Sequence, residues 1–115
     1  MVLSVSERHV GHSDACAVLA VSGEIDIATC AVLRSALDSL HHGGAHRIVV
    51  DLSDVPYCDS TGIGVFALYA KRLLEAGGRL EVTGLRPAVA EIFSVAGLTA
   101  VVPSFATVES ALRGA

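Results

Sequence analysis

Asp59, Ser60 and Thr61 form the polar triplet whose chemistry is best defined in this sequence. It stands between the apolar, β-branched run 47–52, which is typical of a strand, and a run that carries apolar residues at helical spacing from Ile63 onward. Ser60 is therefore predicted at or next to a helix N-cap. A phosphate on its hydroxyl would lie at the positive end of the helix dipole, on a surface loop. The triplet thus fits either a simple helix cap or a reversible phosphorylation site.

Two catalytic roles compete with these interpretations. Ser60 is not in a G-x-S-x-G motif, and every histidine precedes it, whereas the α/β-hydrolase order requires a histidine after the serine. Asp51 follows a strand-like run and could accept a phosphoryl group, but a Mg²⁺-assisted aspartyl phosphate needs further carboxylates. The first predicted strand supplies no acidic pair, because it ends in the sequence Glu7-Arg8-His9. We therefore expect no enzymatic activity, and we expect Asp51 to brace the following loop.

Composition narrows the remaining classes of protein and of site. The 115 residues are 52% hydrophobic with a formal net charge of −4 and no basic cluster, which argues against nucleic-acid binding. No run is long and apolar enough for a membrane span, and the first residues do not resemble a signal peptide. None of the five histidines has metal-ligand spacing to another histidine or to a cysteine, so we expect no metal and no cofactor. Three cysteines without a C-x-x-C motif are expected to be reduced and mostly buried, as in a cytoplasmic protein; they are Cys16, Cys30 and Cys58.

The elements that must position the triplet alternate between strand-like and helix-like segments. Strands are predicted at 2–10, 15–21, 47–52, 79–83 and 101–102. Helices are predicted at 28–40, 61–76, 87–96 and around 108–112. Glycine-containing segments separate them, and a turn at 11–14 joins the first two strands. This order predicts a single α/β domain with a mixed β-sheet packed by about four α-helices, in which the first two strands are antiparallel.

Three motifs together resemble a known family. They are GEID at 23–26, VVDLS at 49–53 and YCDSTGIG at 57–64. In this order and at these distances they are similar to the bacterial anti-sigma factor antagonists of the STAS domain family. The resemblance runs over about residues 3–112, so we expect one STAS domain across 1–115. Cys58 stands where many relatives carry an aliphatic residue.

The resemblance implies a regulatory switch. In such a switch the unphosphorylated antagonist binds an anti-sigma factor that is also a serine kinase of the histidine-kinase-like ATPase type, and a sigma factor is released. Phosphorylation of the serine, here Ser60, ends the binding, and a metal-dependent serine phosphatase restores it. This implies a bacterial cytoplasmic phosphoprotein that regulates transcription in a stress response or in sporulation. The partner-binding residues implied by the resemblance are Gly23, Glu24, Asp26, Asp59, Thr61 and Gly62.

The same fold also serves as a STAS subunit of lipid-transport ATPase complexes, which is the alternative function. Such subunits often lack the phosphorylatable triplet. The intact sequence from Asp59 to Gly62 therefore favours the switch. The hydroxyl of Thr61 is expected to bond within the helix turn, which leaves Ser60 as the phosphorylation site.

Overall fold

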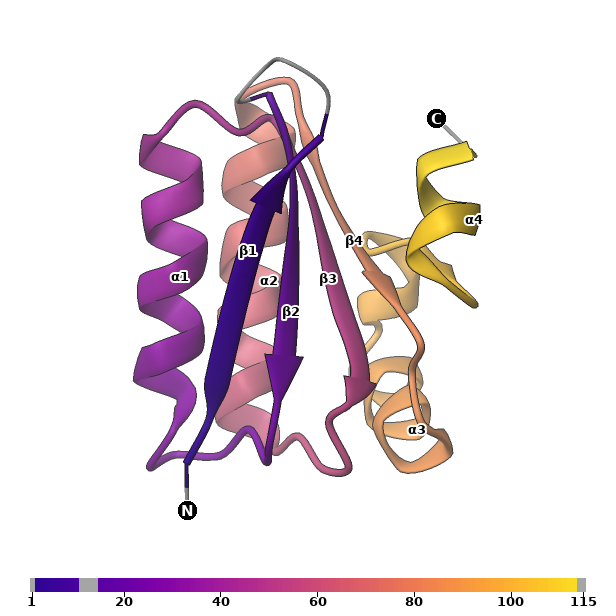
Figure 1. The fold of residues 1–115 in the computed structure, drawn as a ribbon. Helices are drawn as coiled ribbons and strands as arrows, with labels where there is room; N and C mark the ends of the chain where they lie inside the picture. The colour runs from indigo at the N-terminus through magenta and orange to yellow at the C-terminus, as the bar shows by residue number, and fades with distance from the viewer. Residues whose placement is uncertain (1, 11–14, 114–115) are drawn as a thin grey trace.

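The structure is a computed structural model that describes residues 2–10 and 15–113. The predicted turn at 11–14 lies outside the described residues. Five strands form one sheet in the order β1-β2-β3-β4-β5, in which β1 and β2 are antiparallel and the other neighbouring pairs are parallel (Figure 1). The strands are β1 Ser4–His9, β2 Cys16–Ser22, β3 Arg47–Asp54, β4 Arg79–Thr83 and β5 Ser104–Phe105.

Four α-helices and a short 3-10 helix occur within the described residues. They are α1 Cys30–His42, α2 Ser60–Glu75, α3 Pro87–Val95, η1 Leu98–Ala100 and α4 Val108–Arg113. The predicted α/β class, the mixed sheet and the antiparallel first pair are confirmed. Because the chain alternates strand and helix, each parallel pair of strands is joined through a helix, as parallel pairing requires.

The helices cover the two faces of the sheet unequally. Figure 1 shows α1 and α2 side by side on one face, where they share the main hydrophobic core with α3. A smaller cluster, in which Ala111 of α4 packs on Val18 and Val49, lies on the other face. Strand alternation explains the division, because Ile48 and Val50 point into the main core while Val49 between them points toward α4.

The prediction of the last strand at 101–102 is wrong, since the last strand is at Ser104–Phe105. Val102 instead closes the turn of η1, where its N–H donates to the carbonyl of Leu98 at 2.8 Å, and its side chain is buried in the main core. The strand begins only after Pro103, whose carbonyl accepts from Val82 of β4 at 3.0 Å. The two valines therefore have β-branched side chains without taking part in the sheet.

Parallel pairing of β2 and β3 brings two distant segments of the chain together. The C-terminal ends of both strands lie at the same edge of the sheet, so the loops that follow them meet there. An isolated parallel bridge between Ile25 and Cys58 joins these loops. The GEID and YCDSTGIG motifs, more than 30 positions apart in the sequence, therefore lie beside each other.

Candidate phosphorylation and partner-binding site

The two loops are fixed to each other by backbone hydrogen bonds. The N–H of Ile25 donates to the carbonyl of Tyr57 at 2.9 Å, and the N–H of Asp59 donates to the carbonyl of Ile25 at 3.0 Å. A third bond of 3.1 Å runs from the N–H of Gly23 to the carbonyl of Asp54. The side chain of Ile25 is fully buried, which anchors the pair of loops in the core. The site is therefore a stable part of the fold, held by the same kind of interactions as the sheet.

Asp59, and not Ser60, is the N-cap of α2. Its backbone is extended, and its carboxylate accepts hydrogen bonds from the N–H groups of Thr61 at 2.9 Å and Gly62 at 3.2 Å. The hydroxyl of Thr61 donates to the same carboxylate oxygen. This last bond is the main reason that the pKa of Asp59 lies below its ordinary value. Hydrogen bonds from backbone N–H groups, including the N–H of Ile27, lower the pKa further. Asp59 therefore carries a negative charge next to Ser60 at neutral pH.

Ser60 is the first residue of α2, and its side chain is exposed. Among the residues that the structure describes, no hydrogen bond engages its hydroxyl. Thr61 differs, because it is half-buried and its hydroxyl is bonded to Asp59, as the sequence indicated. A phosphoryl group can thus reach the oxygen of Ser60 without breaking the cap, whereas a reaction at Thr61 would break it.

Gly62 lies beneath the site and is buried. A Cβ atom at this position would lie 2.5 Å from Cγ2 of Ile25 and 2.6 Å from Sγ of Cys58. Any larger residue would therefore push α2 away from the bridge between the loops. The structure places Gly62 where it allows this close approach, and its predicted contact with a partner stays a prediction.

The loop after β2 brings Gly23, Glu24 and Asp26 to the same end of the sheet as Ser60. Asp26 organises this loop, because its carboxylate accepts from the N–H groups of Ala28 at 2.9 Å and Thr29 at 3.0 Å. The buried hydroxyl of Thr29 donates to the carbonyl of Glu24 at 2.7 Å. Gly23 adopts a φ of +116°, which few other residues can adopt. All three predicted residues therefore shape the loop, and Glu24 and Asp26 remain half-exposed beside the site.

Sequence reasoning missed two exposed apolar side chains in these loops. Ile27 is 77% exposed, and Tyr57 is 49% exposed. Ile27 lies next to the cap of α2, because its N–H bonds to Asp59, and Tyr57 bonds through its carbonyl to the opposite loop. Apolar and aromatic side chains that are held on well-ordered loops are typical of protein-protein contact surfaces. In the sequence, an apolar residue close to a polar motif could have indicated them, although the same pattern also fits a core residue.

Other candidate groups have structural roles. Cys58 is buried, and burial, with a smaller effect of the charge on Asp59, raises the pKa of its thiol to about 12. Cys16 and Cys30 are only partly buried, so the expectation that the cysteines are mostly buried holds for Cys58 alone. Asp51 was expected to brace the loop that follows it, but its carboxylate accepts from the N–H of Ser53 at 3.0 Å, and both residues lie within β3, so the bond braces the end of the strand. Within the described ranges, no His, Cys, Asp and Glu side chains cluster as a metal site would require.

Comparison with known proteins identifies the family. A family model described as "Mlab, STAS domain" matches residues 9–103. The chain belongs to the STAS domain family. The resemblance that the three motifs carry is thereby confirmed, and the single sheet with its helices is the fold of this STAS domain.

Similar proteins are anti-sigma factor antagonists. The chain is 34% identical over 93 residues to an anti-sigma-B factor antagonist of Bacillus subtilis (strain 168), which covers 81% of this STAS domain and 84% of the relative. An anti-sigma factor antagonist of Mycobacterium paratuberculosis has a similar crystal structure, with 26% identity, a TM-score of 0.85 and coverage of 98% and 93% of the two chains. The Bacillus cell fate determinant SpoIIAA, solved in its phosphorylated form, shares the fold at 20% identity, with a TM-score of 0.70 and coverage of 94% and 97%.

The α-helices within residues 2–10 and 15–113 are short and amphipathic, or short and partly exposed. None of them combines the length and the apolar character that a bilayer-crossing helix needs.

Proposed function

We propose that this STAS domain is an anti-sigma factor antagonist controlled by phosphorylation of Ser60. In the unphosphorylated state it binds an anti-sigma factor that is also a serine kinase, and a sigma factor is set free. The observation that carries the proposal is the free, exposed hydroxyl of Ser60 beside the charged cap Asp59 and the exposed side chains of Ile27 and Tyr57. The names of the similar proteins support the same class of function.

The position of Ser60 explains how a phosphate could end binding without unfolding the domain. Phosphorylation adds about 1.5 to 2 negative charges at neutral pH. Ser60 lies at the N-terminus of α2, where the positive end of the helix dipole tolerates this charge. A partner that covers Ile27 and Tyr57 would instead have to bury the phosphate beside the carboxylate of Asp59. A loss of about 1.4 kcal/mol already weakens binding tenfold, so one phosphate is sufficient as a switch.

The cycle needs a second enzyme that removes the phosphate. A metal-dependent serine phosphatase would act on the same exposed oxygen, which requires no rearrangement of the cap. The domain itself then supplies a substrate side chain and a docking surface, and it needs neither a cofactor nor catalytic activity of its own.

The test compares three variants as bait in lysate of the native cells: Ser60→Ala, Ser60→Asp and the control Ser94→Asp. Ser94 is an exposed serine of α3, so the control adds the same charge outside the two loops that form the site. We expect a soluble serine kinase to be retained by Ser60→Ala, by Ser94→Asp and by the unmodified protein, and to be lost with Ser60→Asp. Mass spectrometry of the wild-type protein should show phosphate on Ser60.

Equal retention of the kinase by Ser60→Ala and Ser60→Asp would contradict the switch. Co-purification of a membrane ATPase with Ser60 unmodified would support the alternative, a STAS subunit of a lipid-transport complex.

A further inference from the structure

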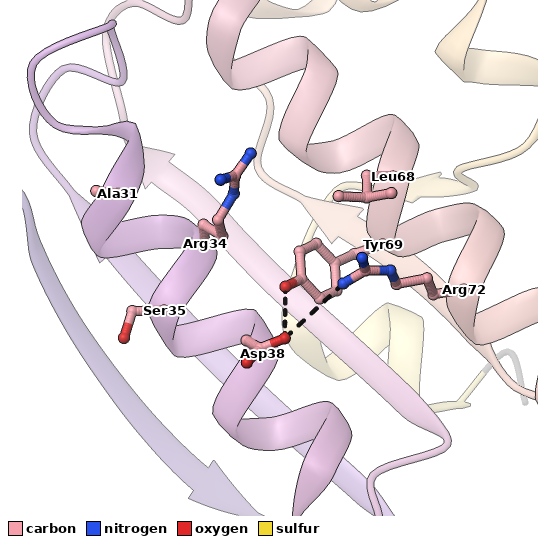
Figure 2. A pocket seen from close by; sticks show the side chains of 7 residues that line it. All are labelled: Ala31, Arg34, Ser35, Asp38, Leu68, Tyr69 and Arg72. Atoms are coloured by element: carbon pink, nitrogen blue, oxygen red, sulfur yellow. Dashed lines mark hydrogen bonds and ion pairs between the residues drawn. The ribbon is translucent and has the colours of Figure 1, made fainter.

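A groove of about 390 Å³ lies between α1 and α2, outside the loops that carry Ser60 (Figure 2). Three residues of each helix define its chemistry: Arg34, Ser35 and Asp38 of α1, and Leu68, Tyr69 and Arg72 of α2. The groove is open to solvent along both helices, and nothing in the phosphorylation switch described above uses it.

The single carboxylate of the groove is already engaged. Asp38 accepts a hydrogen bond of 2.7 Å from the hydroxyl of Tyr69, and the Nη1 atom of Arg72 lies 3.8 Å away (Figure 2). Its second oxygen lies 3.2 Å from Nδ1 of His42. The hydroxyl of Tyr69 is the main reason that the pKa of Asp38 lies below its ordinary value. The guanidinium of Arg72 also lies over the ring of Tyr69, at 5.1 Å from its centroid, so it is engaged with both residues.

Arg34 has no such partner. It is exposed, and Figure 2 shows its guanidinium directed away from Asp38, although residues four apart on a helix commonly pair. Across the described part of the chain, no carboxylate pairs with it. The groove therefore holds two guanidinium groups against one carboxylate. This local excess of positive charge occurs on a chain whose formal net charge is −4.

The groove lies within reach of a partner that covers Ser60. Both helices begin at the end of the sheet where the two loops meet (Figure 1). Leu68 comes eight residues after Ser60, which corresponds to about 12 Å along α2. A standard interface buries about 800 Å² on each partner, a patch roughly 30 Å across. One partner can therefore contact both places.

We propose that this groove is a second docking point for the serine kinase partner and that it receives an aspartate or glutamate side chain of that kinase on Arg34. A guanidinium binds a carboxylate through two parallel hydrogen bonds, and the apolar surface of Leu68 suits the methylene groups of an acidic side chain. A dianionic phosphate fits less well, because Asp38 stands beside the two arginines. This proposal rests on the proposed function and adds the chemistry of the partner's surface.

The experiment uses the kinase that Ser60→Ala retains, in purified form. It measures the affinity of this kinase for Arg34→Gln, for Arg34→Glu and for the control Arg8→Glu. Arg8 is an exposed arginine of β1, and it lies beside Thr107 and Glu109 on the face of the sheet that α4 covers, opposite to α1 and α2. We expect Arg34→Gln to weaken binding about tenfold, the effect of losing a hydrogen bond between charged groups, and Arg34→Glu to weaken it further. Arg8→Glu should bind like the wild type, and equal melting temperatures of all variants should exclude loss of folding.

Salt provides the second readout. Raising the salt concentration from about 0.05 M to about 0.5 M should weaken kinase binding by the wild type more than kinase binding by Arg34→Gln. The reason is that salt screens the charged contact of Arg34, which the variant lacks. If both Arg34 variants bind like Arg8→Glu while Ser60→Asp does not bind, the groove proposal is wrong and the switch stands. If no kinase binds the unmodified chain or Ser60→Ala, the proposed function and the groove proposal both fail.

Discussion

Asp59 holds Thr61 by two hydrogen bonds to one carboxylate oxygen, one from the backbone N–H and one from the hydroxyl. Ser60, which lies between these two residues, is left with an exposed hydroxyl that is bonded to nothing in the described part of the chain. Two adjacent hydroxyl residues thus differ in availability because only one of them faces the cap. This geometry gives a physical reason for a kinase to choose Ser60 over Thr61.

Removal of the Asp59 cap should lower stability in a pH-dependent way. Asp59→Ala removes the acceptor of the first-turn N–H groups, whereas Asp59→Asn keeps an oxygen there, so the melting temperature should fall more for alanine. The pKa of Asp59 lies below its ordinary value, chiefly through the bond from Thr61. The charge therefore stabilises the fold fully above the unfolded pKa of about 3.9 and loses this effect as the pH falls through the folded pKa.

Urea unfolding of the wild type and Asp59→Asn from pH 7 to pH 2 measures this effect. The difference between their free energies of unfolding should be constant down to about pH 5 and should shrink below about pH 4. A difference that stays the same at every pH would show that the charge of Asp59 does not contribute.

Most of the fold follows from local patterns in the sequence. The β-branched run of β3 and the helical spacing in α2 are each formed by residues that are close together in the sequence. Both elements were therefore predictable without knowledge of the rest of the fold. The last strand was not, because Val101 and Val102 have the composition of a strand while Val102 is needed in the core. The strand that does form has two residues, and its pairing with β4 defines it more than its own pattern does.

The site was predictable only in part. The resemblance indicated that the two loop motifs act together, but their contact depends on the parallel pairing of β2 and β3, which no local pattern specifies. Aspartate and serine are both good N-caps, so the sequence alone could not decide that Asp59 has this role and leaves Ser60 free. Ile27 was missed because exposure of a single apolar side chain depends on the path of its loop.

Gly62 and Gly64 of α2 should respond in opposite ways to alanine. At Gly62 an added Cβ would lie 2.5 Å from Ile25, so we expect Gly62→Ala to lower the free energy of unfolding by about 1–3 kcal/mol, as overpacking does. At the exposed Gly64 nothing lies within 4 Å of the added atom, and Gly64→Ala should raise stability by about 0.5–1 kcal/mol. Urea unfolding measures both variants. If Gly62→Ala is as stable as Gly64→Ala, the tight contact beneath the site is not present.

Ile27 and Tyr57 should contribute to binding more than to folding. We expect Ile27→Ser and Tyr57→Ala each to weaken the complex with the kinase about tenfold or more, because buried apolar and aromatic anchors dominate interfaces. Val95→Ser is the matched control, since Val95 is 82% exposed on α3 and Ile27 is 77% exposed. The three variants should stay within about 0.5 kcal/mol of the wild type in stability. Calorimetric titration measures the affinity of each variant for the kinase. Equal losses of affinity for Ile27→Ser and Val95→Ser would argue against a binding surface at Ile27 and Tyr57.

Thr83 of β4 should stabilise the domain when it is replaced by valine. Its side chain is 1% exposed, and its hydroxyl has no hydrogen-bond partner among the residues that the structure describes. A buried unsatisfied hydroxyl costs about 1–3 kcal/mol, and valine has the same shape without it, so Thr83→Val should raise the free energy of unfolding by about 1 kcal/mol. Thr29 is 5% exposed, and its hydroxyl donates to Glu24 at 2.7 Å, so Thr29→Val should lower stability. Urea unfolding compares the two, and a loss of stability in Thr83→Val would mean that its hydroxyl is bonded in solution.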